Sequence, residues 1–216
     1  MNEVTGVILA GGRGQRMGGL DKGLQPFLGQ RLIDHAVTRL KPQVQSLLIV
    51  ANRHREIYSE LGYPVVDDAS AKLAGLDGAS DVTPSASPRF EGPMIGLMAG
   101  LMTCKTPWLA SVPCDSPFFP SNLIACLSAV TKRQGAYLAV AATQGKEGVR
   151  LQPVFSLVHV DLQGSLRQFL ESGQRRFTDW LTQQNASLVL FEQSEAFANA
   201  NSLKDLDALE HKVGRS

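Results

Sequence analysis

Six glycines, Arg16 and Lys22 crowd into residues 11–23, directly after the apolar run of residues 4–10. A glycine-rich turn lets backbone N–H groups converge on an anion, because no side chains hold the backbone away. The cationic side chains favour phosphate as that anion, since charge-assisted contacts are about twice as strong as neutral ones. The alternative is a solvated turn with incidental charges. The pattern favours a phosphate-binding loop.

This loop departs from both familiar phosphate-binding patterns. It contains no G-x-x-x-x-G-K-[ST] sequence, and Met17 stands where G-x-G-x-x-G requires its last glycine after Gly12 and Gly14. The chain is therefore predicted to be neither a P-loop NTPase nor an ordinary dinucleotide-binding protein.

Asp115 is the second position that could do chemistry. It follows the apolar stretch WLASV within VPCDSP, which places it at the carboxyl end of a predicted buried strand, where open α/β sheets bind ligands. Mg²⁺ prefers hard oxygen ligands and keeps several waters, so one or two carboxylates suffice to hold it. The alternative is an aspartate that caps the turn before Pro117. From the residues alone, both a magnesium ligand and a turn cap stay open for Asp115.

Apolar runs and helical patterns alternate along the chain and must position these residues. Strands are predicted at residues 4–10, 46–51, 64–66, 108–114, 136–142, 151–157 and 186–191. Helices are predicted at residues 32–40, 55–62, 94–103, 120–130 with a serine cap, near 159–171 and near 202–211. Continuously apolar strands separated by helices are typical of a parallel sheet covered on both faces. We predict a three-layer α/β/α fold with a mostly parallel, Rossmann-like sheet.

The domain organisation is expected to be simple. A length of 216 residues fits one domain better than two, so residues 1–216 are predicted to form a single domain. Residues 69–93 are crowded with Ala, Ser, Gly and Pro and show no clear period. They are predicted to form a long loop, which inside a compact domain is usually functional or disordered.

Composition narrows the classes of partner. Charged residues make up 19% of the chain and the formal net charge is +1, so we expect no nucleic-acid partner. No apolar run approaches the roughly 18 residues of a membrane span, and no signal-peptide pattern opens the chain. We therefore expect no membrane partner and a cytoplasmic protein. Its three cysteines lack a C-x-x-C pair and its four histidines are dispersed, which predicts reduced thiols and no zinc site.

The stretch LAGGRGQRMGGLDKG (9–23) resembles the nucleotide-binding signature L-A-G-G-x-x-x-R-M-G-x-D-K, with one additional glycine. This signature is typical of the nucleotidyltransferase family that includes the molybdenum cofactor guanylyltransferases. Later blocks of the family resemble further segments in the same order. These segments are ANRHREIY (51–58), VVDD (65–68), GPMIGLMAGL (92–101), VPCDSPFFP (112–120) and AFANANSLKDL (196–206). The resemblance covers most of the chain.

The resemblance implies a glycosyltransferase-A-like fold and transfer of GMP from GTP to molybdenum-molybdopterin, with Mg²⁺ as cofactor and pyrophosphate as the second product. Such transfers depend mostly on positioning and on neutralising charge at phosphoryl oxygens. By resemblance, Arg16 neutralises the β- and γ-phosphates, Lys22 bridges toward the α-phosphate and Asp115 holds the metal. The backbone that approaches the nucleotide is that of Leu9, Ala10, Gly11 and Gly12.

Two further residues are implied to lie near the nucleotide. Asn52 follows the strand at 46–51 and by resemblance contacts the base, with an ordinary capping asparagine as the alternative. Asp68 ends the VVDD segment and by resemblance lies near the nucleotide, with a turn-forming aspartate as the alternative.

The acceptor side is implied by two pairs of residues. Arg175 and Arg176 resemble a basic pair that meets the anionic pterin phosphate, and a solvated charge pair is the alternative. Asn199 and Asn201 are implied to help hold the metal or the acceptor. Amides that cap the helix predicted near 202–211 are the alternative there.

Two other function classes stay open from the sequence. A cytidylyltransferase or sugar-phosphate nucleotidyltransferase is the alternative within the enzymes, and a non-catalytic nucleotide- or pterin-binding carrier is the alternative outside them. Phosphate-binding cations together with a metal-binding aspartate favour an enzyme. The partners implied are GTP, molybdenum-molybdopterin, molybdenum-insertion proteins and apo-molybdoenzymes, and we expect a monomer.

Overall fold

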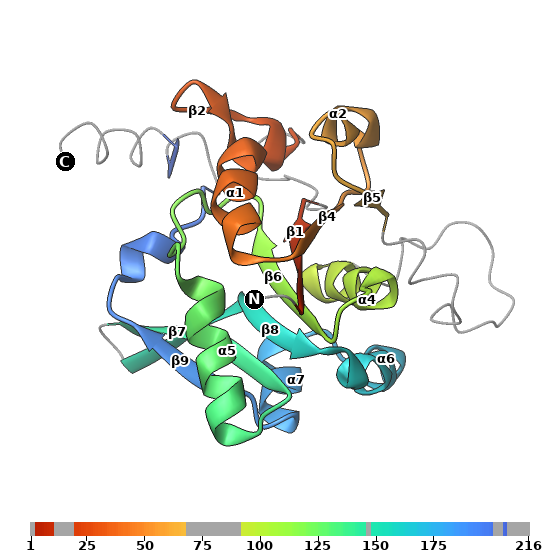
Figure 1. The fold of residues 1–216 in the computed structure, drawn as a ribbon, viewed down its shortest axis with the longest axis vertical. Helices are drawn as coiled ribbons and strands as arrows, with labels where there is room; N and C mark the ends of the chain where they lie inside the picture. The colour runs from red at the N-terminus through yellow and green to blue at the C-terminus, as the bar shows by residue number, and fades with distance from the viewer. Residues whose placement is uncertain (1–2, 11–19, 68–91, 146–147, 201–204, 207–216) are drawn as a thin grey trace, which may run out of the picture.

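A seven-stranded mixed sheet forms the centre of the described part of the molecule (Figure 1). The computed structural model describes residues 3–10, 20–67, 92–145, 148–200 and 205–206. The strands are β1 (Val4–Leu9), β4 (Ser46–Val50), β5 (Val65–Val66), β6 (Trp108–Pro113), β7 (Leu138–Gly145), β8 (Gly148–His159) and β9 (Ser187–Phe191). Their order across the sheet is β5-β4-β1-β6-β8-β7-β9. Each predicted strand is confirmed, with its ends shifted by a few residues.

The directions of the strands determine which edge of the sheet holds their carboxyl ends. β1 pairs in parallel with β4 and β6, β4 with β5, and β7 with β9. β8 is antiparallel to both of its neighbours, so β7 and β9 run in the same direction as β6. The carboxyl ends of six strands therefore lie at one edge of the sheet. The prediction of a mostly parallel sheet is confirmed.

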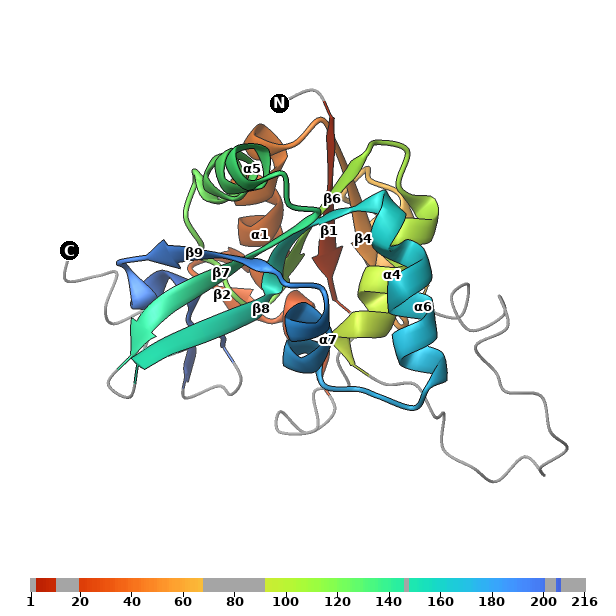
Figure 2. The ribbon, with the colours of Figure 1, turned by 90° about the horizontal axis from the view of Figure 1, so that it is seen from below.

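Helices cover both faces of this sheet (Figures 1 and 2). One face carries α1 (Leu32–Leu40) and α5 (Leu123–Gln134), which share a core cluster with Ile8 of β1. The other face carries α4 (Pro93–Thr103), α6 (Gln163–Glu171) and α7 (Phe177–Gln183), which share a second cluster with Val7. Neighbouring residues of a strand point to opposite faces, so β1 serves both cores. The three-layer α/β/α architecture is confirmed.

Four helices have boundaries that differ from the predictions, and one of them is α6, which begins at Gln163 and not near residue 159. α2 (Arg55–Ser59) is shorter than the predicted helix at 55–62, because tight three-residue turn hydrogen bonds end it before Gly62. α4 begins at Pro93, so this residue is helical and not part of the predicted loop 69–93; residues 69–91 lie outside the described residues. α5 begins at Leu123 with Asn122 as N-cap, so the predicted serine cap is wrong. Most of the helix predicted near 202–211 also lies outside the described residues.

Several short elements were not predicted from the sequence. They are η2 (Lys22–Leu24), the hairpin of β2 (Pro26–Phe27) and β3 (Gln30–Arg31), η3 (Lys41–Gln43), η4 (Val160–Leu162), η5 (Ser194–Phe197) and the helix α7. The hairpin turns at Leu28 and Gly29, both with positive φ, which is the conformation that a tight two-residue hairpin requires. None of the helices in the described part of the chain combines the length and apolar composition needed to cross a lipid bilayer.

Arg39, near the end of α1, braces the loop that follows β6. Its Nε donates to the carbonyl of Pro117 at 3.0 Å, and its Nη1 donates to the carbonyl of Phe119 at 3.1 Å. Two carbonyls of one loop are thus held by one planar guanidinium, whose donors have a fixed geometry. This contact fixes the loop that carries Asp115 against α1.

The side chain of Gln43 links the same loop to the start of α5. Its Nε2 donates to the carbonyl of Pro120 at 3.2 Å, and its Oε1 accepts from the backbone N–H of Ile124 at 3.0 Å. The side chain of Asn122 makes no capping hydrogen bond, so an amide 81 residues before Ile124 satisfies a helix donor in its place. Gln43 is buried, which makes both contacts costly to lose.

The variant Gln43→Ala is expected to lower the free energy of unfolding by about 2 kcal/mol or more, because it leaves a buried N–H group without its partner. Urea unfolding followed by circular dichroism measures this change. The matched control is Gln45→Ala, since Gln45 is exposed and its replacement should change stability by no more than about 0.5 kcal/mol. Equal changes in the free energy of unfolding for the two variants would contradict this structural role of Gln43.

Candidate active site

The ends of β1 and β6 bring the predicted nucleotide loop and the predicted metal ligand together. Leu9 lies opposite Pro113 in the sheet register, and its carbonyl accepts from the N–H of Cys114 at 3.2 Å. Ala10 is buried, and its N–H donates to the carbonyl of Val50 at the end of β4. Leu9 and Ala10 therefore lie between the ends of β4 and β6. Three residues predicted from it, Gly11, Gly12 and Arg16, lie outside the described residues.

Lys22 and Asp115 form an ion pair at this edge. The distance from Lys22 Nζ to Asp115 Oδ2 is 3.2 Å, and the two side chains are 21% and 11% exposed. Burial raises the pKa of the Asp115 carboxyl above its usual value, and the Lys22 ammonium only partly opposes this shift. The structure thus joins two of the three residues predicted to act in catalysis, although 93 positions separate them in sequence.

The segment before Asn201 secures the Asp115 loop from the other side. The N–H of Ala200 donates to the carbonyl of Asp115 at 2.8 Å. The hydroxyl of Ser116 donates to Oδ1 of Asn199 at 2.6 Å. Asn199 is therefore brought beside the predicted metal ligand, while Asn201 lies outside the described residues.

Asn52 follows β4 and is exposed at the same edge of the sheet. The strand β5, which pairs with β4, ends two residues before Asp68. Asp68 itself lies outside the described residues. The preceding Asp67 accepts from Arg55 at 2.8 Å, and this pair links α2 to the end of β5. The predicted base-binding segment is thus fastened to its neighbouring strand.

Arg175 and Arg176 lie in the turn between α6 and α7. Figure 2 shows this turn at the end of the molecule toward which β1 points, the end that holds Asp115. Both residues are exposed. Nη1 of Arg175 donates to the carbonyls of Leu170 and Gln174 at 2.7 and 2.6 Å, so this side chain also caps the end of α6. Arg176 is the N-cap residue of α7.

A buried contact that sequence analysis missed lies directly behind Lys22. Oδ1 of Asp21 accepts from the hydroxyl of Tyr58 at 2.6 Å and from the N–H of Gly23 at 3.2 Å. Asp21 is 6% exposed and Tyr58 is fully buried. An Asp that accepts from the N–H two residues later is an ordinary turn signal in sequence, but nothing local points to a tyrosine 37 residues away.

Cys114 adjoins Asp115 and is buried. Burial raises the pKa of this thiol well above its usual value, and the nearby Asp115 carboxylate acts in the same direction. A thiol that stays protonated is a poor nucleophile. The cysteine therefore fills space at the site and offers no covalent chemistry.

The sequence of the chain matches a known family. The family model described as the MobA-like NTP transferase domain matches residues 6–187. The chain belongs to this family. The molybdenum cofactor guanylyltransferase of Bordetella pertussis is 42% identical, over 97% of this chain and 98% of that protein. The protein of the same name from Cupriavidus taiwanensis is 43% identical, over 97% of both chains. The family resemblance of the sequence is confirmed.

A solved structure carries the same fold. Molybdopterin-guanine dinucleotide biosynthesis protein A from Archaeoglobus fulgidus superposes with a TM-score of 0.72 over 98% of this chain and all of that chain, at 16% identity. Similarity at this low identity establishes the fold alone. The MobA-like chain thus has the predicted nucleotidyltransferase fold.

The donor set at the edge of the sheet suits one particular kind of cation in this MobA-like enzyme family. Among the described residues, no group of three or more His, Cys, Asp and Glu side chains could hold a metal by itself. Among the described residues, the carboxylate of Asp115 pairs with Lys22, whereas Oδ1 of Asp21 already accepts from Tyr58 and Gly23. Mg²⁺ that also binds substrate phosphates needs only one or two protein carboxylates. Asp115 fits such an ion, because a cation offsets the cost of its burial.

Proposed function

We propose that this protein transfers GMP from GTP to molybdenum-molybdopterin, forming the molybdopterin guanine dinucleotide cofactor and pyrophosphate. The observation that carries the proposal is the Lys22–Asp115 pair at the carboxyl edge of the sheet, where phosphate charge can be neutralised. Its setting supports guanylyl transfer, since proteins named molybdenum cofactor guanylyltransferase are 42 and 43% identical to nearly the whole chain.

The reaction forms one bond and breaks one. A phosphate oxygen of the molybdopterin bonds to the α-phosphorus of GTP, and the bond from that phosphorus to the pyrophosphate leaving group breaks. Lys22 holds the α-phosphate through its ammonium, and Arg16 neutralises the β- and γ-phosphates. The backbone from Leu9 to Gly12 donates to the nucleotide. These contacts position and stabilise charge without any covalent enzyme intermediate.

Mg²⁺ is part of the proposal, with Asp115 as its protein ligand and with Asn199, which accepts from the hydroxyl of the adjacent Ser116, as an assisting group. When bound, the ion neutralises charge on phosphate oxygens. The contact with Asp115 keeps the Lys22 ammonium oriented before substrate enters. Asn201 is proposed to act beside Asn199 on the metal or the acceptor.

The remaining assignments follow the same arrangement. Asn52 and Asp68 are proposed to face the guanine nucleotide, and Arg175 and Arg176 the anionic pterin phosphate. Arg176 is the better candidate of the pair, because Arg175 also caps α6. We further propose a single-domain monomer that works in the cytoplasm, where its cysteines stay free thiols, and that meets molybdenum-insertion proteins and apo-molybdoenzymes.

A nucleotide panel tests the proposal. With Mg²⁺ and molybdenum-molybdopterin present, GTP is expected to give pyrophosphate and the dinucleotide, whereas CTP, ATP and UTP are not. A thermal-shift panel provides the binding control, since GTP at a hundred times its Kd adds about 2.7 kcal/mol of stability. Turnover with CTP instead of GTP would identify a cytidylyltransferase. Stabilisation by GTP without pyrophosphate release would identify a carrier.

A further inference from the structure

The hydroxyl of Tyr58 is the one buried polar group of α2 that reaches toward the proposed active site. Tyr58 is the buried residue among the five of this short helix. Its hydroxyl donates to Oδ1 of Asp21 at 2.6 Å, which is a short contact to a carboxylate oxygen. Burial raises the pKa of Tyr58 far above its usual value, so the hydroxyl keeps its proton and remains the donor.

The oxygen that Tyr58 contacts also shapes the turn of Lys22. Oδ1 of Asp21 accepts from the N–H of Gly23 and so caps η2, the turn that begins at Lys22. Gly23 of this turn packs closely against the tyrosine. A methyl group at Gly23 would lie 2.5 Å from the Tyr58 hydroxyl oxygen and 3.3 Å from Sγ of Cys114. The side chain of Asp21 therefore holds the turn that carries Lys22, and the hydroxyl of Tyr58 holds the side chain of Asp21.

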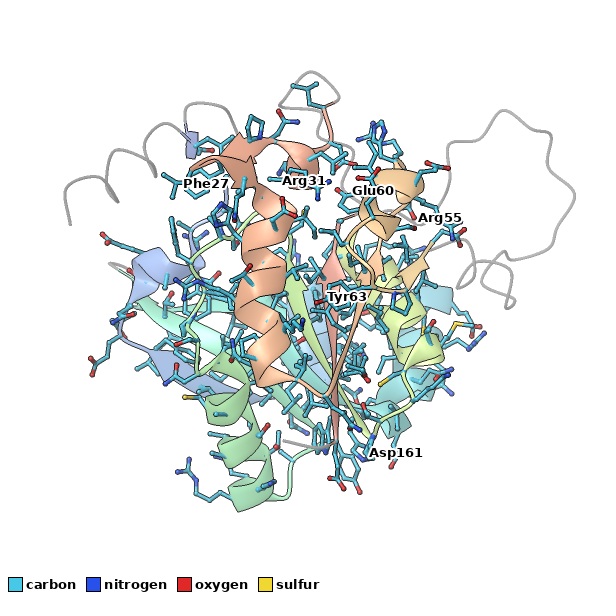
Figure 3. The ribbon with its side chains drawn as sticks, turned by 45° about the horizontal axis from the view of Figure 1, so that its top comes forward. Phe27, Arg31, Arg55, Glu60, Tyr63 and Asp161 are labelled. Carbon is cyan, nitrogen blue, oxygen red and sulfur yellow. The ribbon has the colours of Figure 1, made fainter. Side chains whose placement is uncertain are left out.

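A second contact, nearer the surface, ties the residue after α2 to the end of β3. Nη1 of Arg31, at the end of β3, lies 3.9 Å from Oε2 of Glu60, just after α2. Figure 3 shows these two side chains between α1 and α2. This pair is partly exposed and contributes little energy. The buried Tyr58–Asp21 contact therefore holds α2 to the turn of Lys22 more strongly than the Arg31–Glu60 pair holds it to β3.

We propose that Tyr58 is a positioning residue, which acts through Asp21 to hold the Lys22 ammonium at the transferring phosphate. This inference rests on the proposed function, in which Lys22 acts on the α-phosphate. Because α2 follows the segment of Asn52 at the end of β4, the contact also ties the nucleotide-facing segment to the catalytic lysine. The buried hydrogen bond between Tyr58 and Asp21 then connects the segment that binds the nucleotide to the turn that places the lysine.

The first test is Tyr58→Phe, which removes the hydroxyl and keeps the ring. A small displacement of a reacting group can cost one to two orders of magnitude, so kcat for GMP transfer is expected to fall about tenfold. KM for GTP is expected to stay within about twofold, since ground-state binding has other contacts. The matched control is Tyr63→Phe, because Tyr63 packs on the same core cluster. Its kcat should stay within about twofold of the parent.

The decisive test repeats Tyr58→Phe in a Lys22→Ala background. If Tyr58 acts through the lysine, the second change should lower kcat by less than about twofold, because contacting groups are not additive. A further tenfold loss in that background would overturn the inference and leave Tyr58 a structural residue. Asp21→Ala is the second probe, since it removes the oxygen that accepts from both Tyr58 and Gly23. Its kcat should fall at least about tenfold, as in Tyr58→Phe, and a kcat within about twofold of the parent would overturn the proposed route.

These outcomes separate the inference from the function on which it rests. If the unchanged protein released no pyrophosphate from GTP, the proposed function and the role of Tyr58 would both be wrong. If it did, and Lys22→Ala were impaired while Tyr58→Phe matched Tyr63→Phe, only the inference would fail.

Discussion

Asp115→Asn is expected to lower the rate of GMP transfer by at least about a hundredfold, a loss of roughly 2.7 kcal/mol of transition-state stabilisation. The amide keeps the shape and one acceptor oxygen but removes the negative charge, so it should hold Mg²⁺ more weakly. Part of the lost rate should return as Mg²⁺ is raised. Steady-state pyrophosphate release over a series of Mg²⁺ concentrations measures both effects.

Stability provides an independent check on Asp115→Asn. Burial raises the pKa of this carboxyl, so its ionised form disfavours folding at neutral pH. The metal-free variant should therefore unfold no more easily than the parent at pH 7. This advantage should disappear as the pH falls below about 4, where the parent carboxyl is protonated in both states.

The matched control is Asp161→Asn. Asp161 is exposed and pairs with His159 at the far end of the sheet, below β1 in Figure 3. Its replacement should leave turnover and its Mg²⁺ dependence unchanged within about twofold. An Asp115→Asn protein with the parent rate in dilute Mg²⁺ would show instead that this aspartate only shapes the turn before Pro117.

Lys22→Ala is expected to lower kcat/KM for GTP by about a hundredfold or more, the scale observed when one preorganised charge-stabilising donor is removed. Most of the loss should appear in kcat, because the ammonium acts on charge that grows in the transition state. In the metal-free protein the same variant leaves the buried Asp115 carboxylate without its 3.2 Å partner. The pKa of Asp115 should then rise further, which a titration by NMR would detect.

Lys41→Ala is the control for the lysine. Lys41 is exposed, with its Nζ 6.0 Å from the centre of the Tyr63 ring. Its loss should keep kcat/KM within about twofold. Kinetics of Lys22→Ala within about threefold of the parent would make Lys22 an ordinary surface lysine and would remove the central support of the proposed function.

The sequence predicted the elements whose pattern is local. Residues 32–40 repeat apolar side chains at helical spacing, and α1 occupies the same range. Strand direction cannot be read in this way, because an apolar run looks the same in a parallel and an antiparallel pair. The reversed β8 therefore appeared only in the structure. The hairpin at Leu28 and Gly29 was missed because leucine rarely adopts a positive φ.

The contacts of the candidate site also differ in whether a local sequence pattern predicts them. Leu9 and Asp115 could be predicted to meet, because each follows a buried strand and parallel strands end at one edge. Asp21 and Tyr58 could not, since their contact depends on how the turn of Lys22 packs under α2. Gln43 gave no signal either, because a glutamine that caps a distant helix resembles any polar residue after a helix.

The Asp115 loop is joined to Ala200, which donates to it, and to Asn199, which accepts from it, and both residues come late in the sequence. Both residues follow all seven strands of the described sheet in sequence. A ribosome adds about 5–20 residues per second from the N-terminus, and domains tend to fold as their sequence emerges. The nascent chain therefore contains every strand before it contains the segment that fastens Asp115. We expect the growing polypeptide to acquire its sheet before it acquires the ability to transfer GMP, so that catalysis awaits translation through Ala200.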